Sequence, residues 1–342
     1  MNSYWVRNRL CIPVVMLASM NVRKVACIGV GLIGQGWATL FAWKGYDVNL
    51  YDSNRKSLEH ALIHIRSNLN LLEESGMLGG QSVNECLERV KIQPSIRDAV
   101  GGVDYVQESV HESYQVKKKV FKDMDDFSCE YTILASSSSA LKMSIIQKAT
   151  RNQARCILVH PWNPTHLMPL VEIVPGRKTS PDTVNAAKDF MITLGKVVVV
   201  QKKELTGTVG NRLAAALWRE AIDLVNRGIV GVDDIDRAVL AGPGMRWATV
   251  GPHLSYHLAG GKGGIEGYLD HIGPTMEARW RSLAKWTSIP PSARTKLSEE
   301  IKRSYVNREM PIEEVCRKRD RDLIKLLKMF YYRTDEPVQF GF

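Results

Sequence analysis

The sequence lacks the marks of several large protein classes. Its 342 residues contain no run of about 18 apolar residues, so no transmembrane helix is predicted. The six cysteines are scattered, without a C-x-x-C pair or a ligand-like spacing, which favours free thiols in a reducing compartment and predicts no metal site. Low-complexity tracts and internal repeats are absent. What remains is the composition of a globular protein, 44% hydrophobic and 24% charged, long enough for two domains.

Acidic residues are missing from the first 24 positions, which carry four of the ten net positive charges. Elsewhere basic residues alternate with acids, as in "RKRDR" at 317–321. Such interleaving is typical of a solvated helix face, whereas a nucleic-acid-binding surface needs basic residues clustered on one side. The charge pattern therefore indicates no nucleic-acid partner and favours small anionic ligands through a mildly positive field.

Apolar segments with strand character alternate with helical segments, such as 113–127, over the first two thirds of the chain. The strand-like segments are 23–30, 47–52, 90–93, 104–109, 131–136, 156–161, 170–175 and 196–200. This alternation predicts βαβ units and a doubly wound α/β domain with a mostly parallel sheet, over residues 22–204. Strand signals stop near Thr206, and a long amphipathic helix follows at 211–228. Residues 205–342 are therefore predicted to form an all-helical C-terminal domain.

The segment "GVGLIG" places glycines at positions 29, 31 and 34, after a predicted strand and at the start of a predicted helix. Asp52 follows Gly34 by 18 residues, at the end of the second strand. In this context the motif predicts a Rossmann-type dinucleotide site, in which the glycines admit a pyrophosphate and Asp52 accepts from ribose hydroxyls. An acid at this position repels a 2′-phosphate, so NAD is favoured over NADP. The alternative is a tight turn without a ligand. The predicted contacts in the loop are Gly29, Gly31, Leu32, Ile33 and Gly34.

The segment "HPWNPTHLMPLVEIVPG" (160–176) contains four prolines and a strand-like "LVEIV" with one acid in it. His160 ends one predicted strand, and Glu172 lies one strand over. Because ligands bind at the carboxyl ends of parallel strands, His160 and the preceding "SSSSALK" (136–142) are expected near a nicotinamide. Glu172 can orient the imidazole of His160 and stabilise its protonated form, which is the arrangement of general acid–base catalysis.

These motifs, together with "TGTVGNRL" (206–213), resemble the 3-hydroxyacyl-CoA dehydrogenase family from about residue 22 onward. The resemblance implies an NAD-binding domain, a helical dimerising domain and a four-residue catalytic site. The implied catalytic residues are Ser139, His160, Glu172 and Asn211. Further implied cofactor contacts are Glu112, Lys117 and Asn163. One departure is visible, since Ser137 and Ser138 stand where the family has Asn and Thr, although Ser139 keeps its spacing of 21 residues to His160.

Residues 242–264 resemble the branch of this family that acts on free 3-hydroxy acids, such as L-gulonate 3-dehydrogenase and L-carnitine dehydrogenase. In that branch Arg246 would face the substrate carboxylate, which a guanidinium can bind bidentately. An interdomain or subunit salt bridge is an equal alternative for Arg246. Trp247 and Tyr256 could meet a trimethylammonium group or belong to the core.

The predicted function is NAD-dependent oxidation of a 3-hydroxy acid to the 3-oxo acid. His160 takes the hydroxyl proton, Ser139 and Asn211 bind the substrate oxygen, and Glu172 supports the imidazolium. One alternative is a dehydrogenase that acts on a CoA thioester, and another is a non-catalytic NAD(H)-binding or structural protein on the same fold. The expected partners are a small anionic substrate and a second copy of the chain, through the helical domain, without nucleic acid or membrane.

The first residues, "MNSYWVRNRLCIPVVMLASM", weakly resemble a signal or transit sequence. We expect residues 1–21 to form a disordered extension, or to precede a functional start at Met20. The cofactor-binding fold predicted after it favours a cytoplasmic location. A mitochondrial location is the alternative if the extension is a transit peptide.

Overall fold

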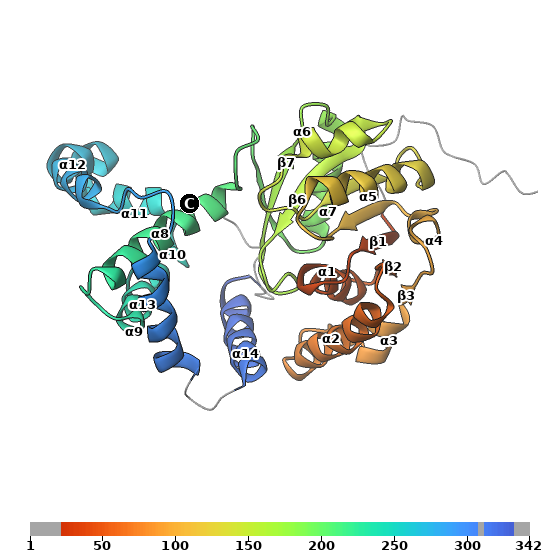
Figure 1. Cartoon of the computed structure of the whole chain (residues 1–342), viewed down its shortest axis with the longest axis horizontal. Coiled ribbons are helices and arrows are strands. Elements are labelled where there is room, and N and C mark those ends of the chain that lie inside the picture. The colour runs from red at the N-terminus through yellow and green to blue at the C-terminus, as the bar shows by residue number, and fades with distance from the viewer. Residues whose placement is uncertain (1–21, 307–310, 332–342) are drawn as a thin grey trace, which may run out of the picture. The chain divides into compact units, whose positions relative to one another are not determined.

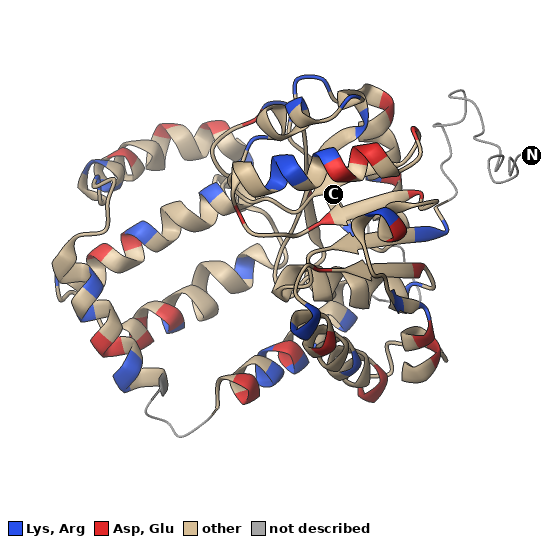
Figure 2. Cartoon of the chain, turned by 45° about the vertical axis from the view of Figure 1, so that its right-hand side comes forward, with Lys and Arg blue, Asp and Glu red and all other residues tan. Residues whose placement is uncertain are grey.

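The computed structural model describes residues 22–306 and 311–331, so the predicted extension over residues 1–21 lies outside the described residues. Contacts divide the described chain into two compact units. The first contains residues 22–211 and 316–331, and the second contains residues 212–306 and 311–315. Along the helices of both units, Lys and Arg are interspersed with Asp and Glu (Figure 2).

The first unit is built on one eight-stranded sheet with the order β3-β2-β1-β4-β5-β6-β7-β8 (Figure 1). Every neighbouring pair is parallel except β6 and β7, which run antiparallel. The strands are β1 (Lys24–Ile28), β2 (Asp47–Tyr51), β3 (Val90–Ile92), β4 (Tyr105–Glu108), β5 (Ile133–Ser136), β6 (Cys156–Pro161), β7 (Leu170–Pro175) and β8 (Val197–Val200). Each falls within a predicted strand segment, and the mostly parallel α/β class is confirmed.

Helices cover both faces of this sheet, as the alternation along β1 shows. Val25 and Cys27 belong to one hydrophobic cluster, whereas Ala26 and Ile28 belong to another. The first cluster is covered by α1 (Leu32–Trp43), α2 (Arg55–Glu74), α3 (Val83–Glu88) and α7 (Pro181–Thr193). The second is covered by α4 (Ile96–Val100), α5 (Tyr114–Phe127) and α6 (Met143–Ile146).

The last helix, α14 (Ile312–Phe330), also packs on the first unit. Ile324 and Leu327 are buried in the first cluster, since the apolar stripe of this helix meets the sheet-covering helices. The sequence predicts one helical domain over residues 205–342, whereas the contacts place residues 316–331 of it in the first unit.

The second unit is all helical. Its helices include the greater part of α8 (Val209–Asn226), α9 (Val232–Val239), α10 (Met245–Trp247), α11 (Pro252–Ala259), α12 (Gly264–Ser282) and α13 (Pro291–Ile301). Within the described ranges, no helix combines the length and hydropathy needed to cross a membrane. Large apolar side chains are exposed on this unit, among them Leu213, Trp218, Leu240, Met245 and Trp280.

Candidate active site

Three glycines turn the chain from β1 into α1, and each meets a different constraint. Gly29 adopts a φ of +90°, and a Cβ added there would lie 2.7 Å from the Ser109 carbonyl carbon. A Cβ added at Gly34 would lie 1.9 Å from the Gly29 carbonyl oxygen, so glycine is needed for the helix to pack this closely. At Gly31 none of the described atoms lies within 4 Å of an added Cβ. Gly31 therefore leaves open space, which suits close approach of a ligand to the backbone.

The N-terminus of α1 begins at this open space. Gly31 is its N-cap and provides no side-chain hydrogen bond, and no acidic residue occupies the first turn. The first N–H groups of the helix and its dipole therefore favour an anion at this point. This is the arrangement that a dinucleotide pyrophosphate requires.

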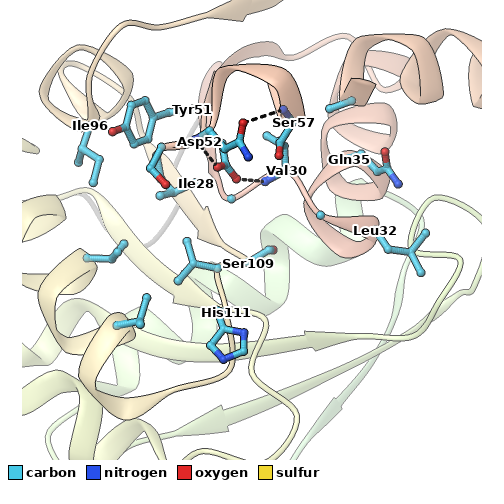
Figure 3. A pocket seen from close by; sticks show the side chains of 18 of the residues that line it. Ile28, Val30, Leu32, Gln35, Tyr51, Asp52, Ser57, Ile96, Ser109 and His111 are labelled. Carbon is cyan, nitrogen blue, oxygen red and sulfur yellow. Dashed lines mark hydrogen bonds between the residues drawn. The ribbon is translucent and has the colours of Figure 1, made fainter. Parts of the chain in front are cut away.

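A pocket of about 1090 Å³ opens beside this loop, at the carboxyl ends of β1, β2 and β4 (Figure 3). Four predicted cofactor residues line it: Gly29, Gly31, Leu32 and Asp52. Of the other two in the loop, Gly34 is buried and Ile33 packs against the first hydrophobic cluster. Ser109 and His111 lie on the opposite side of the pocket from Asp52 (Figure 3).

Asp52 follows β2, and its carboxylate is fixed by two backbone N–H groups. Val30 donates to Oδ2 at 3.0 Å, and Asn54 donates to Oδ1 at 2.9 Å. A carboxylate has about four acceptor sites, so lone pairs remain for ribose hydroxyls. Its negative charge opposes a 2′-phosphate. The loop, the helix N-terminus and this carboxylate together fit NAD.

The antiparallel pairing of β6 with β7 sets His160 directly opposite Glu172. Directly opposed residues project from the same face of a sheet, so their side chains meet. His160 Nδ1 lies 3.2 Å from Glu172 Oε2, and the two residues are 7% and 1% exposed. The two residues that the sequence pairs as base and orienter are thus in contact.

Glu172 accepts hydrogen bonds from four groups. Oε2 faces His160 Nδ1, Trp162 Nε1 at 3.2 Å and Thr208 Oγ1 at 2.6 Å, while Oε1 accepts from the Gly210 N–H at 2.7 Å. Burial raises the pKa of Glu172, but these hydrogen bonds outweigh burial and lower the pKa to about 2. Glu172 is therefore an anion at neutral pH, fixed against the imidazole.

Asn211 contacts the other nitrogen of the imidazole. Its Nδ2 lies 3.4 Å from His160 Nε2, while Thr208 Oγ1 lies 3.4 Å from Nδ1. With the Nδ1 proton directed at Glu172, Nε2 carries the lone pair and is the basic nitrogen. The Asn211 amide can donate to that lone pair. Three of the four predicted catalytic residues therefore form one cluster.

Ser139 lies in the loop after β5, and its side chain is exposed. It lines a small cavity of about 10 Å³ that Thr208 also lines. The loop is fixed by Glu112, whose Oε1 accepts from Ser138 Oγ at 2.5 Å and from the Ser139 N–H at 3.2 Å. Burial raises the pKa of Glu112, but the Ser138 hydroxyl and the charge of Lys117 outweigh burial and lower it. In this structure Glu112 orders the serine loop.

Lys117 is 1% exposed and has three acceptors around its ammonium group. Nζ lies 2.6 Å from Glu108 Oε1, 3.1 Å from the Val110 carbonyl oxygen and 3.4 Å from Glu112 Oε2. An ammonium has three N–H donors, so all three are engaged within the protein. Lys117 therefore supports the wall of the dinucleotide pocket from inside.

The two remaining predicted site residues have exposed side chains. Asn163 lies in the loop after β6, before Pro164. Arg246 lies in α10 of the second unit, and within the described ranges it forms no ion pair.

Sequence reasoning missed Thr208, Trp162 and Glu108 as site residues. Thr208 and Trp162 both donate to Glu172, and Glu108 is a fully buried carboxylate that accepts from Lys117, Ser136 and the Val110 N–H. Burial raises the pKa of Glu108 despite these partners. Two sequence signals existed, an acid ending an apolar strand in "DYVQES" and the Thr-x-Gly spacing in "TGTVGNRL".

The glycine loop, Asp52 and the buried histidine–glutamate pair on a doubly wound sheet are those of an NAD-dependent dehydrogenase. Residues 24–205 match the 3-hydroxyacyl-CoA dehydrogenase NAD binding domain, and residues 207–292 match the C-terminal domain of the same family. The chain belongs to the 3-hydroxyacyl-CoA dehydrogenase family, and its cofactor is NAD.

Several relatives are similar over most of their length. L-carnitine dehydrogenase of Oceanobacillus iheyensis is 35% identical over 314 residues, covering 90% of this chain and 98% of that protein. The human lambda-crystallin homolog is 37% identical over 279 residues, covering 81% and 86%. Among solved structures, the NAD⁺-dependent 5-formyl-3-hydroxy-2-methylpyridine 4-carboxylic acid 5-dehydrogenase has a TM-score of 0.75 and 28% identity, covering 90% and 98%.

Proposed function

We propose that the chain oxidises a free 3-hydroxy acid to the 3-oxo acid, with His160 as the general base. The observation that carries this proposal is the buried, ionised Glu172 behind Nδ1 of His160, with Asn211 at Nε2. NAD, when bound, supplies the hydride acceptor.

The residues of the chain then have separate roles. His160 Nε2 accepts the proton of the substrate hydroxyl, and Glu172 stabilises the imidazolium that results. The Asn211 amide, which faces Nε2, can turn its N–H to the substrate oxygen, and the Ser139 hydroxyl is the second donor to it. The contacts of NAD are proposed at the glycine loop, Asp52, Glu112 and Asn163, whereas Lys117, whose ammonium is engaged by protein acceptors, is proposed to act by holding Glu112.

The names of the relatives support a free acid over a CoA ester. L-carnitine and the pyridine carboxylic acid in those names each carry a free carboxylate, for which Arg246 is the proposed clamp. The test measures NADH formation with L-carnitine, L-gulonate, 3-hydroxybutyrate and 3-hydroxybutyryl-CoA. A CoA ester that outperforms every free acid would replace this proposal with acyl-CoA oxidation. NADH binding without turnover on any substrate would indicate a non-catalytic binding protein.

We also propose a homodimer formed through the helical unit. Exposed large apolar side chains such as Trp218, Leu240 and Trp280 support it, because their burial against a second copy would stabilise the association. Light scattering of the full chain would give the mass of two copies, and a monomeric mass at micromolar concentration would contradict the proposal. A cytoplasmic location stays a prediction, which imaging of a tagged full-length chain tests.

A further inference from the structure

A second pocket, of about 560 Å³, lies in the first unit and shares no lining residue with the dinucleotide pocket. Three chain segments meet around it: the start of α6 and the turn after it, the turn from β7 to α7, and the segment after β8. Its charged lining consists of five cations and one acid: Lys142, Lys148, Arg177, Lys202, Lys203 and Glu204. Several stretches coloured for Lys and Arg lie at the top of the first unit in Figure 2.

Ser144 ties the three segments together. Its N–H donates to Glu204 Oε1 at 2.8 Å, its hydroxyl donates to Glu204 Oε2, and the Arg177 N–H donates to its Oγ at 2.7 Å. Gly176 fits closely behind, because a Cβ added there would lie 2.1 Å from Gln147 Oε1. The pocket is therefore held by hydrogen bonds and close packing, and both oxygens of its only carboxylate are engaged by Ser144.

Among the residues that the structure describes, the five cations have no anionic partner that would neutralise them. Within the described ranges none of the five forms an ion pair, so the lining carries a formal charge of +4 around a single hollow. All five side chains are exposed, and their like charges border one hollow, where a bound anion would offset them. The volume lies within the range of small-molecule sites, about 300–1,000 Å³.

We propose that this pocket binds a small molecule that carries a diphosphate group. A diphosphate with a free terminal phosphate carries more negative charge at pH 7 than a carboxylate or a single phosphate, so it offsets more of the positive charge of the lining. Lysine and arginine side chains are the usual partners of phosphate oxygens. The cavity that contains Ser139 shares Lys142 and Glu204 with this pocket but holds only about 10 Å³, about one water, so it offers no passage for a ligand.

The experiment is calorimetric titration of the full chain with inorganic pyrophosphate at low ionic strength. The protein is first saturated with NADH, which blocks the pyrophosphate site of the dinucleotide pocket. We expect a Kd of about 0.1 mM or tighter. Lys203→Glu should weaken it by at least about tenfold. Lys188→Glu makes the same charge change on an exposed lysine of α7 outside the pocket, and should change the Kd by less than about twofold.

Absence of binding to the NADH-saturated protein, or equal losses in Lys203→Glu and Lys188→Glu, would overturn the proposal. Arg177→Gln is the second variant, with the same expected loss, should Lys203→Glu not fold. A diphosphate could belong to a free metabolite or to the CoA moiety of an acyl-CoA. Titration with free CoA distinguishes these two sources. If CoA competes with pyrophosphate, the ligand of the pocket is a CoA moiety. If pyrophosphate binds and CoA does not compete, the ligand is a free diphosphate. Because binding is measured without turnover, failure here is distinguishable from failure of the proposed dehydrogenase activity.

Discussion

Glu172→Gln tests the link between the fold and the proposed chemistry, because it removes one charge while keeping the shape of the side chain. The carboxylate accepts hydrogen bonds from four groups, on His160, Trp162, Thr208 and Gly210. A glutamine amide has one oxygen with two lone pairs, and its NH₂ group accepts nothing. At least two buried donors then lose their acceptor, and each unsatisfied donor costs about 1–3 kcal/mol of folding stability. We expect the free energy of unfolding at pH 7 to fall by about 2–6 kcal/mol.

The pH dependence gives a second, independent magnitude. The pKa of Glu172 is lowered from 4.5 to about 2 in the folded protein. A gap of this size corresponds to about 3 kcal/mol of stability. Because the folded pKa is the lower one, this contribution is complete above about pH 4.5 and is lost as the pH falls toward 2. Denaturant unfolding at pH 7 and at pH 3 should therefore show the gap between wild type and Glu172→Gln shrinking with acid.

Turnover should respond more strongly than stability. Without the anion at Nδ1 the imidazolium of His160 is less stable, and kcat should fall by about 10²- to 10⁴-fold while the Kd for NADH changes little. Glu85→Gln is the control, since it makes the same change on an exposed carboxylate that caps α3. A stability gap that is equal at pH 7 and pH 3, together with wild-type kcat, would refute the assignment of Glu172.

The remaining predictions address the base, the cofactor and the substrate. His160→Ala should lower kcat by about 10²- to 10⁴-fold with NADH binding retained, and a near-normal rate in stopped-flow assays would remove His160 as the base. Asp52→Ala should narrow the preference for NAD over NADP in kcat/KM, and a wild-type preference for NADP would contradict the reading of this acid. Gly31→Ala should keep the Tm but weaken NADH binding, whereas Gly34→Ala should lower the Tm, because only the second meets backbone atoms. Arg246→Lys should reduce kcat/KM for free 3-hydroxy acids and spare 3-hydroxybutyryl-CoA, and equal losses on both would argue against a carboxylate clamp.

The strands and the cofactor loop could be predicted because their signals are local. Apolar runs bounded by turn residues mark all eight strands, and the spacing of Gly29, Gly31 and Gly34 follows from one strand–helix turn. The amphipathic pattern of α14 is equally local, but it does not tell which surface the helix covers. Its place beside the sheet depends on contacts of Ile324 and Leu327 with residues far away in the chain.

The partners of the site carboxylates could not be predicted, because they are tertiary. Thr208 reaches Glu172 across 36 residues, and Ser138 reaches Glu112 across 26. Nothing in a single sequence distinguishes a threonine that caps a buried acid from one in an ordinary loop. Resemblance to the family supplied Lys117 as a cofactor contact, but only the structure shows its ammonium surrounded by three protein acceptors.

Two groups of acids position the two halves of the site separately. Glu172 fixes the imidazole from the antiparallel strand β7. Glu112 fixes the serine loop directly, and Glu108, at the end of β4, supports the wall of the dinucleotide pocket through Lys117. Within the described ranges, the carboxylate of Glu172 accepts hydrogen bonds only from His160, Trp162 and the 208–210 segment. A change at Glu172 therefore acts on the proton-accepting group and leaves the cofactor wall in place. That separation is why rate and NADH affinity can serve as independent readouts of the two halves.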